Sequence, residues 1–489
     1  MRTCGILMPL FSLPSPHGIG TLGRGAYRFV DFLRESGQHY WQLLPIGPTG
    51  YGDSPYQSFC AFAGNPYFID PNRLEEDGLL TRAEIEAADC ECDPGRIDYQ
   101  MLYQRRFALL RQAAGRLNPA ASDFKRFCGG NSFWLEDYAL FMALKRAHGE
   151  ASWQDWPEAY RMRQESALER ARSMLAEEIF FWKAVQFLFD RQYRQLKRYA
   201  NQNEIELVGD IPIYVSPDSS ELWAQSELFQ TTPDRTLSRV AGVPPDGFSA
   251  DGQVWGNPLY DWKRHKEEDF AWWIRRLRHA GGIYDVVRID HFRGFAGYFS
   301  IPAGEDTAKN GRWETGPGIP FLHAIRRALP DLRIIAEDLG YLTDDVRKLL
   351  QASGYPGMKL LQFAFDSREA SDYLPHHYGR NSVVYTGTHD NTTTRDWQES
   401  APPDDVALAR DYLNAPPGSD LTEAMIRAAL ASVCDTAIIP LPDWLNLGRE
   451  GRINTPSTLG GNWVWRCAPN ALTGELSERI LHLTRLYGR

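Results

Sequence analysis

Short runs rich in valine and isoleucine alternate with stretches of helical periodicity along much of this 489-residue chain. The most informative runs are residues 284–290, 332–337 and 382–390, which read YDVVRID, LRIIAE and SVVYTGTHD. Continuous runs of β-branched residues are typical of parallel strands that are buried on both faces. Such strands, separated by helices, favour an α/β fold of the (β/α)8 TIM-barrel type.

The chain is about twice as long as a plain barrel, which needs roughly 250 residues. We therefore expect a single catalytic barrel domain over residues 1–489, with large, mostly helical insertions around its C-terminal face. Residues from about 65 to 202 have helical patterns and predict a helical insertion subdomain. Residues from about 215 to 275 are rich in Pro, Gly, Ser, Asp and Trp and predict an active-site loop insertion.

Further helices and strands are predicted in the helical insertion and in the barrel. An apolar stripe from Leu168 to Leu196 predicts one long helix, and its aromatic bulk favours core packing over a partner-binding coiled coil. The remaining predicted strands are 39–46, 205–213, 358–364 and 436–441, and the flanking helices are 26–35 and 475–486.

Three carboxylates stand at the downstream ends of the strand-like runs: Asp290, Glu337 and Asp390. The C-termini of barrel strands open onto one face, where side chains far apart in sequence converge. Arg288 precedes Asp290 by two residues and so shares its face, where it would keep Asp290 ionised as a nucleophile must be. Glu337 ends an apolar run, so that burial would raise its pKa and suit it to donate a proton. Two such acids can cleave a sugar linkage.

Each acid also has a structural interpretation. Asp290 has the sequence context of an ion pair with Arg288, and Asp338 is expected to cap the next helix or to stabilise the turn before it. Asp390 is a residue type preferred as a helix cap, and His389 is typical of a buried core histidine. Their joint position at a third strand end favours a functional site.

Two loops carry aromatic rings and polar groups of the kind that bind sugars. The loop 50–57 has the Gly and Pro content of paired turns, and the loop 246–258 has that of an ordered connection, so both also have a structural interpretation. The candidate substrate contacts in these loops are Tyr51, Ser54, Tyr56, Asp246, Gln253 and Trp255.

Charge and composition exclude several classes of partner. The net charge of −10 argues against nucleic-acid binding, because that affinity depends on Lys and Arg meeting phosphates. No run of 18 apolar residues and no clear leader peptide occur, so we expect no membrane span and no secretion. Seven scattered cysteines indicate a reducing compartment, which predicts a cytoplasmic protein.

Cofactor motifs give no support for nucleotide or metal chemistry. Residues 18–23 match the dinucleotide pattern GxGxxG, but the preceding residues 12–16 read SLPSP instead of a strand. Phosphate-loop, zinc-protease and calcium-loop patterns are absent from the sequence. Cys90 and Cys92 form a close pair without a second ligand pair nearby, so we expect no bound metal.

Taken together, the motifs resemble those of the amylomaltases, the 4-α-glucanotransferases or disproportionating enzymes of the α-amylase superfamily. The resemblance covers essentially the whole chain. It is carried by SLPSPHGIG at 12–20, GYGDSPY at 50–56, GDIPI at 209–213, WGNP at 255–258, RIDHFRG at 288–294, AEDLG at 336–340 and THDN at 388–391.

The resemblance implies a retaining transfer of α-1,4-glucan segments without a metal or an organic cofactor. Asp290 would be the nucleophile, Glu337 the general acid and base, and Asp390 the acid that grips sugar hydroxyls. The implied partners are maltooligosaccharides, amylose or glycogen-derived glucans, and glucose as acceptor; the resemblance defines no oligomeric state. The implied substrate contacts are Arg288, His389, Asp210, Tyr56, Asp246, Gln253, Trp255 and Asn462.

Two departures from the family pattern concern substrate loops: Gly247 stands where some relatives have an aromatic residue, and Ser457 replaces a common glycine. Neither alters the three acids. An α-glucan hydrolase of the same superfamily is the nearest alternative function, and a catalytically silent glucan-binding protein is a more distant one.

Overall fold

A parallel barrel forms the centre of the computed structural model, which describes residues 2–50, 52–90, 93–245, 250–340 and 342–489. Its eight strands follow the order β10-β11-β12-β1-β2-β3-β6-β9, and the prediction of an α/β barrel is confirmed. The strands are β1 Thr3–Leu7, β2 Tyr40–Gln42, β3 Glu206–Ile211, β6 Val286–Ile289, β9 Ile334–Ala336, β10 Gly357–Leu360, β11 Ser382–Tyr385 and β12 Thr436–Pro440.

The barrel closes between β9 and β10 by a mixture of backbone and side-chain hydrogen bonds. Ala336 N donates to Pro356 O at 3.0 Å, and Met358 N donates to Asp338 Oδ1 at 2.6 Å. Gly357 leaves room for this carboxylate, because a Cβ there would lie 2.6 Å from Asp338 Oδ2. The prediction that Asp338 caps the following helix is wrong, because the N-cap of that helix is Thr343 and the buried Asp338 carboxylate replaces part of a strand ladder.

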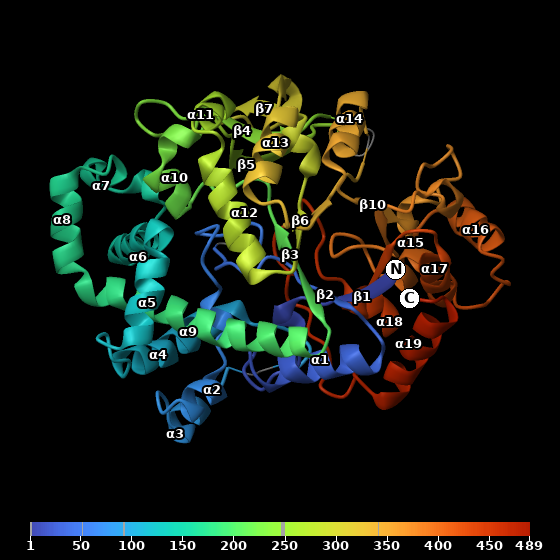
Figure 1. Cartoon of the computed structure of the whole chain (residues 1–489), viewed down its shortest axis with the longest axis horizontal. Helices are drawn as coiled ribbons and strands as arrows, with labels where there is room; N and C mark the ends of the chain where they lie inside the picture. The colour runs from blue at the N-terminus through green and yellow to red at the C-terminus, as the bar shows by residue number, and fades with distance from the viewer. Residues whose placement is uncertain (1, 51, 91–92, 246–249, 341) are drawn as a thin grey trace.

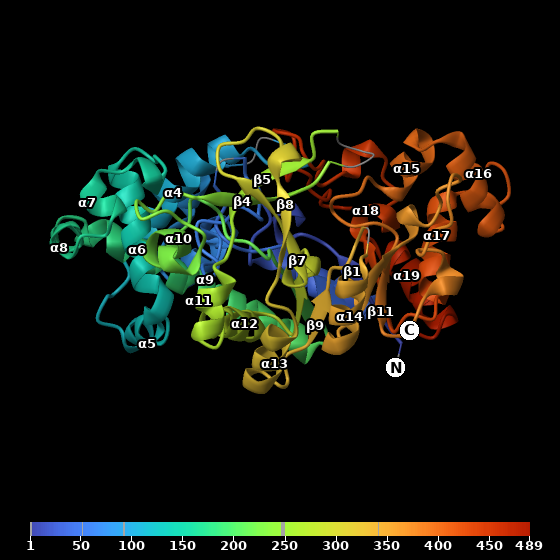
Figure 2. The ribbon, with the colours of Figure 1, turned by 90° about the horizontal axis from the view of Figure 1, so that it is seen from above.

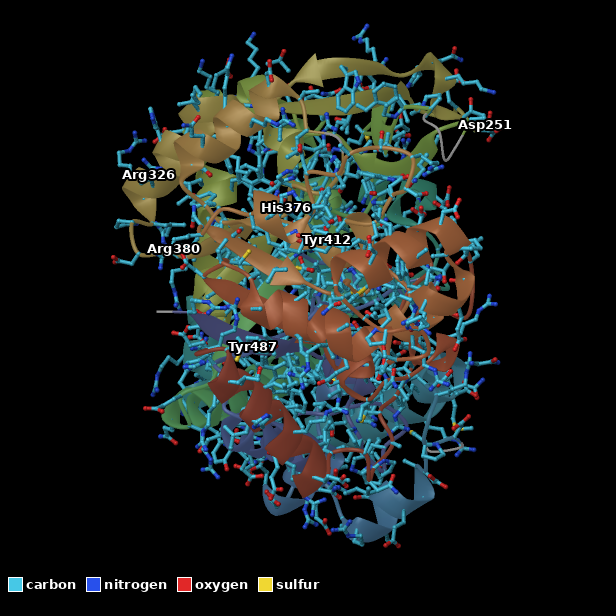
Figure 3. The ribbon with its side chains drawn as sticks, turned by 90° about the vertical axis from the view of Figure 1, so that its right-hand side faces the viewer. Asp251, Arg326, His376, Arg380, Tyr412 and Tyr487 are labelled. Atoms are coloured by element: carbon cyan, nitrogen blue, oxygen red, sulfur yellow. The ribbon has the colours of Figure 1, made fainter. Side chains whose placement is uncertain are left out.

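The outer helices cover the barrel, and those from α15 onwards gather at one end beside both chain termini (Figure 1). Arg2 Nη1 donates to Tyr487 O at 2.8 Å and ties the termini together. Figure 3 faces this end, where His376 Nδ1 and Tyr412 Oη lie 2.9 Å apart. The outer helices are α1 Arg24–Glu35, α11 Trp262–Glu267, α12 Ala271–Ile283, α13 Gly318–Ala328, α14 Asp344–Ser353, α15 Thr394–Ser400, α16 Pro403–Tyr412, α17 Leu421–Ala431, α18 Leu441–Trp444 and α19 Gly474–Leu486.

The helices between β2 and β3 form the opposite end of the molecule, and we call them the insertion helices (Figures 1 and 2). The last of them returns to the barrel, where Tyr199 Oη donates to Asp31 Oδ1 of α1 at 2.7 Å. Their division from the barrel as a subdomain stays a prediction. They are α2 Pro71–Glu76, α3 Arg82–Ala87, α4 Tyr99–Gly115, α5 Ser122–Gly130, α6 Ser132–Ala147, α7 Glu158–Arg161, α8 Glu165–Met174 and α9 Ala176–Gln202.

The predicted single helix over the stripe Leu168 to Leu196 is wrong, because the chain breaks into α8 and α9 at Leu175. Both helices bury apolar residues of the stripe in one core, so the periodicity continues across the break and gives no sign of it. The expected core packing of this stripe is present.

A second, antiparallel sheet occupies part of the segment that was expected to be loop. Its order is β5-β4-β7-β8, and Figure 2 shows these strands together beside the barrel. The pairing joins β4 to β7, in which Arg239 is opposite Pro302, and local sequence patterns do not reveal so distant a partner. Its strands are β4 Arg239–Val243, β5 Gln253–Pro258, β7 Gly297–Pro302 and β8 Arg312–Thr315, and the short helix α10 Ser220–Ala224 precedes them.

The first barrel strand was not predicted, and several predicted strands are too long. β1 has only five residues and is soon followed by Pro9, so its alternation is too short to recognise. The run 382–390 pairs only as far as Tyr385, beyond which the chain leaves the sheet. Within the described residues, no helix is long and apolar enough to cross a bilayer.

Gly209 in β3 is required by packing. A Cβ at this position would lie 2.1 Å from ring atoms of the buried Tyr284. We therefore expect Gly209→Ala to lower the free energy of unfolding by about 1–3 kcal/mol through overpacking. Thermal melting followed by circular dichroism measures this change.

The matched control is Gly129→Ala in α5, where no atom lies within 4 Å of an added Cβ. Alanine there should raise stability by about 0.5–1 kcal/mol, because glycine weakens a helix. A Gly209→Ala variant that melted at or above the wild-type temperature would contradict the packing argument.

Candidate active site

Asp290 and Glu337 directly follow the last paired residues of two neighbouring strands. Ile289 of β6 is in register with Ala336 of β9, and Glu337 N donates to Ile289 O at 3.0 Å. Neighbouring strands lie about 4.8 Å apart, and residues at the same level point to the same face of a parallel sheet. The two carboxyl groups therefore emerge side by side at the C-terminal face of the barrel.

Arg288 joins two carboxylates in the barrel interior. Its Nη1 lies 2.7 Å and 2.6 Å from the two oxygens of Asp210, and 3.0 Å from Asp290 Oδ1. The expected ion pair between Arg288 and Asp290 is present. Burial opposes the charge of Arg288, but Asp210 and Asp290 outweigh it and raise the pKa of the guanidinium well above its usual range. Arg288 therefore stays charged and fixes the position of Asp290.

Glu337 is held by backbone donors on both sides. His291 N donates to Glu337 Oε2 at 2.7 Å, and Leu339 N donates to Glu337 Oε1 at 2.8 Å. His291 adopts a φ of 52°, a left-handed conformation that is uncommon for residues other than glycine and turns its N–H toward Glu337. The strained turn after Asp290 thus orients the second carboxyl group.

Burial raises the pKa of both acids, and each acid also affects the charge of the other. Removal from water raises the pKa of Asp290, Arg288 opposes this shift, and the carboxylates of Asp210, Glu337 and Asp390 add to it. Removal from water also raises the pKa of Glu337, against Arg288 and the two backbone donors. Neighbouring carboxyl groups cannot easily ionise together, so the pair holds one proton over a range of pH.

The two acids differ in their surroundings. Arg288 forms an ion pair with Asp290, whereas no ion pair of Glu337 occurs among the described side chains. Asp290 also retains 29% exposure of its side chain, so water helps to stabilise its charge. These surroundings favour charge on Asp290 over charge on Glu337, which is the distribution that a nucleophile beside a proton donor would require.

Tyr56 connects Asp210 to His389. Its hydroxyl donates to Asp210 Oδ2 at 2.8 Å and lies 2.8 Å from His389 Nε2, while the Tyr56 and His389 rings stack at 5.3 Å. Burial lowers the pKa of His389, so the imidazole is neutral. Since the Tyr56 proton goes to Asp210, we assign the His389 proton to Nε2, which donates to Tyr56 Oη.

Asp390 lies five residues beyond the end of β11, so its prediction as a strand-end residue is wrong in detail. Its carboxylate is fixed from another segment, because Asn454 Nδ2 donates to Asp390 Oδ1 at 2.7 Å. It does not cap α15, whose N-cap is Thr393. The Asp390 side chain is 46% exposed and lies 3.5 Å from His389 Nε2, which leaves it open to a ligand.

Some of the residues that were predicted to contact substrate lie at this site, and others form hydrogen bonds within their own loops. The Trp255 ring meets His291 edge-on at 4.8 Å, and its Nε1 donates to Gln253 Oε1 at 3.0 Å. Ser54 Oγ accepts from Tyr56 N at 3.3 Å and shapes its own turn. Tyr51, Asp246 and Gly247 lie outside the described residues.

The Asn462 side chain forms hydrogen bonds within its own loop. Its Oδ1 accepts from Thr455 N at 2.9 Å, and its Nδ2 donates to Thr458 O at 3.1 Å. Contact between Asn462 and substrate stays a prediction. In the same loop, Ser457 has a φ of 62°, the region that favours the glycine it replaces.

Sequence reasoning missed two residues that complete the site, Asn454 and Trp463. Asn454 stands in the same motif as Asn462, and residue type alone gave no reason to choose between them. The Trp463 ring lies 5.8 Å from the Tyr56 ring and 6.0 Å from the His389 ring. No local pattern reveals this contact, because the three residues come from distant parts of the chain.

Metal-binding clusters of three or more His, Cys, Asp or Glu are absent from the described part of the chain.

The site is that of an enzyme that acts on glycosidic bonds. It has paired carboxyl groups on adjacent strand ends of a closed α/β barrel and a guanidinium behind one of them. Comparison with known proteins agrees with this class: a model of the 4-alpha-glucanotransferase family matches residues 8–473. The chain belongs to this family.

Its relatives are similar over nearly their whole lengths. The 4-alpha-glucanotransferase of Streptococcus pneumoniae is 47% identical over 493 residues, which cover 100% of this chain and 97% of the relative. That of Clostridium butyricum is 44% identical over 486 residues, covering 99% and 100%. Among solved structures, the amylomaltase from Streptococcus agalactiae in complex with acarbose has a TM-score of 0.97 and 40% identity, with 100% of both chains covered.

Removal of the Asp210 charge should change the pH dependence of the reaction. Asp210 raises the pKa of Asp290, and it also shares Arg288 with that residue. In Asp210→Asn the pKa of Asp290 should fall, so the acid limb of the kcat/KM profile should move to lower pH. The measurement is a pH profile of glucose release from maltotriose.

Asp285→Asn is the control, because Asp285 is also paired with a cation, Lys197 at 3.1 Å, and directly precedes β6 at the opposite end of the barrel. Both limbs of its profile should match the wild type. An acid limb that stayed fixed or moved upward in Asp210→Asn would refute the electrostatic role of Asp210.

Proposed function

We propose that this family member transfers α-1,4-glucan segments by double displacement, with Asp290 as nucleophile, Glu337 as general acid and base, and Asp390 as a ligand of sugar hydroxyls. The observation that carries the proposal is the placement of Asp290 and Glu337 at one level of adjacent strands. Retaining enzymes need carboxyl groups about 5 Å apart, which matches the spacing of about 4.8 Å between neighbouring strands.

In the first step, an Asp290 oxygen attacks the anomeric carbon of the donor glucan, and the bond from that carbon to the departing sugar breaks. The Glu337 proton moves to the oxygen of the leaving sugar, and a glycosyl ester of Asp290 remains. Arg288 keeps the attacking carboxylate ionised. The backbone donors on Glu337 stabilise the carboxylate that proton transfer leaves behind.

In the second step, the ionised Glu337 takes the proton of the 4-hydroxyl of an acceptor glucan or of glucose. The acceptor oxygen attacks the anomeric carbon, and the ester bond to Asp290 breaks. Two inversions restore the α-linkage. Transfer, not hydrolysis, is the activity that defines the family, which makes the hydrolase alternative the weaker one.

Two further observations support a site for α-glucans. The amylomaltase from Streptococcus agalactiae, which this chain resembles throughout, was solved in complex with acarbose. The Trp255 ring contacts His291, which follows Asp290, and the Tyr56 ring contacts His389, which precedes Asp390; such aromatic surfaces suit the apolar faces of sugars. The silent-binder alternative is the weakest one, because the family to which the chain belongs is one of transferases.

Incubation with maltotriose as sole substrate tests the function. Transfer predicts free glucose together with a ladder of longer maltooligosaccharides, because each glycosyl ester is taken up by another sugar. Separation of products by chromatography with time resolves the ladder. A mixture that contained only sugars shorter than maltotriose would establish hydrolysis instead.

Glu337→Gln should lower kcat by roughly 10²- to 10⁴-fold, the scale of losing a positioned proton donor. The amide keeps the size of the side chain, so maltooligosaccharide binding should persist. With a fluorinated glycosyl donor that has a good leaving group, the first step needs no proton, and an ester on the peptide containing Asp290 should accumulate. Mass mapping of an adduct to another residue would reassign the nucleophile.

We also propose a cytoplasmic location. All six cysteines of the described part of the chain are free thiols, which is typical of proteins in reducing compartments.

A further inference from the structure

Three aromatic rings from distant segments form one cluster behind the proposed site. Tyr56 and His389 stack at 5.3 Å, and the Trp463 ring lies 5.8 Å from Tyr56 and 6.0 Å from His389. Aromatic pairs within about 7 Å attract one another through ring packing and offset electrostatics. The Trp463 ring therefore contacts both members of the Tyr56–His389 pair and restricts the positions available to them.

The backbone of Trp463 is strained. Its φ is 63°, a conformation that is a genuine outlier for a bulky residue, and its side chain is only 4% exposed. Such a conformation persists only where the surroundings hold it in place, and it is common at functional sites. Trp463 N donates to Ile453 O at 2.8 Å and closes the loop that contains Asn454. We call residues 453–466 the strap, which therefore carries both Asn454 and Trp463.

The start of the insertion helix α4 and the residues just before it bind the strap on the side away from the site. Tyr99, the first residue of α4, donates its hydroxyl proton to Trp463 O at 2.9 Å, and Ile97 N donates to Val464 O at 2.9 Å. Arg466 N donates to Gly95 O at 2.9 Å and extends this edge. The strained residue is thus fixed between the insertion helices on one side and the site on the other.

We propose that Trp463 is a positioning residue for the reaction, held by Tyr99 of the insertion helices in the conformation that orients Tyr56 and His389. The inference rests on the proposed function, because it requires that Tyr56 and His389 flank the reacting sugar. Tyr56 aligns Asp210 by a hydrogen bond of 2.8 Å, and Asp210 in turn aligns Arg288. A shift of the Trp463 ring would therefore be transmitted to the guanidinium that holds Asp290.

The test compares four single variants by their kinetics on maltotriose. Tyr99→Phe removes only the hydroxyl that bonds to Trp463 O. Trp463→Phe keeps an aromatic ring, and Trp463→Ala removes it. Tyr67→Phe is the matched control, because this ring lies 6.3 Å from Tyr99 and its hydroxyl has no hydrogen-bond partner among the described residues.

We expect Tyr99→Phe to lower kcat about two- to tenfold, the scale of one neutral hydrogen bond, with KM for maltotriose nearly unchanged. Trp463→Ala should lower kcat about 10- to 100-fold, the scale of two aromatic pairs, and Trp463→Phe should restore most of the loss. Tyr67→Phe should match the wild type. Melting curves of every variant give the folded fraction, by which each kcat is normalised.

The pH profile separates positioning from a general structural effect. The Tyr56 hydroxyl is bonded to Asp210, and Asp210 raises the pKa of Asp290, which sets the acid limb of the kcat/KM profile. Loss of the Trp463 ring should let Tyr56 and Asp210 shift, so that Asp210 raises the pKa of Asp290 less and the acid limb moves to lower pH, as in Asp210→Asn. A structural role would lower activity equally at every pH.

Wild-type kcat in both Tyr99→Phe and Trp463→Ala would overturn the inference. So would losses that followed only the folded fraction, with an unchanged pH profile. Should Trp463→Ala fail to fold, Tyr99→Phe alone decides between these outcomes. Failure of the wild type to produce the maltooligosaccharide ladder would instead overturn the proposed function, so the two failures are distinguishable.

Discussion

The buried guanidinium of Arg288 is the interaction on which the site depends. A charge removed from water is stable only when it is paired and hydrogen-bonded, and Arg288 meets this need with Asp210 and Asp290. One cation cannot neutralise Asp210, Asp290 and Glu337 together, so this buried cluster of three carboxyl groups favours the uptake of a proton. The same ion pair that joins Asp210 to Asp290 in the barrel interior thereby favours charge on Asp290 over charge on Glu337, as the proposed mechanism requires.

Candidate residues that stand on a strand or directly at its end could be predicted from the sequence alone. Asp290 and Glu337 were predicted because each terminates a β-branched run, and the register of β6 and β9 brings them together. Arg288 was predicted from the alternation of a strand. These inferences depend on local periodicity and on one property of parallel barrels, so they needed no knowledge of the loops.

The rest of the site depends on contacts between distant segments, which local patterns do not encode. Asp390 lies beyond its strand and takes its position from Asn454, more than 60 residues further along the chain. The antiparallel sheet that carries Gln253 and Trp255 pairs strands across a similar gap. Trp463 adopts a backbone conformation that no propensity predicts for tryptophan.

The seam of the barrel at Asp338 links architecture to proton transfer. Glu337 and Asp338 are adjacent, but Glu337 is held beside Asp290 by backbone donors, whereas Asp338 closes the circle of strands by accepting from Met358 N. Among the described strands, only β6 pairs with β9 as a strand, and the other side of β9 is joined to the β10 segment by one backbone bond and by the Asp338 side chain. Separation of β9 from β10 would displace Glu337, so the junction of the barrel with the fewest ladder bonds lies beside the residue that we propose as general acid and base.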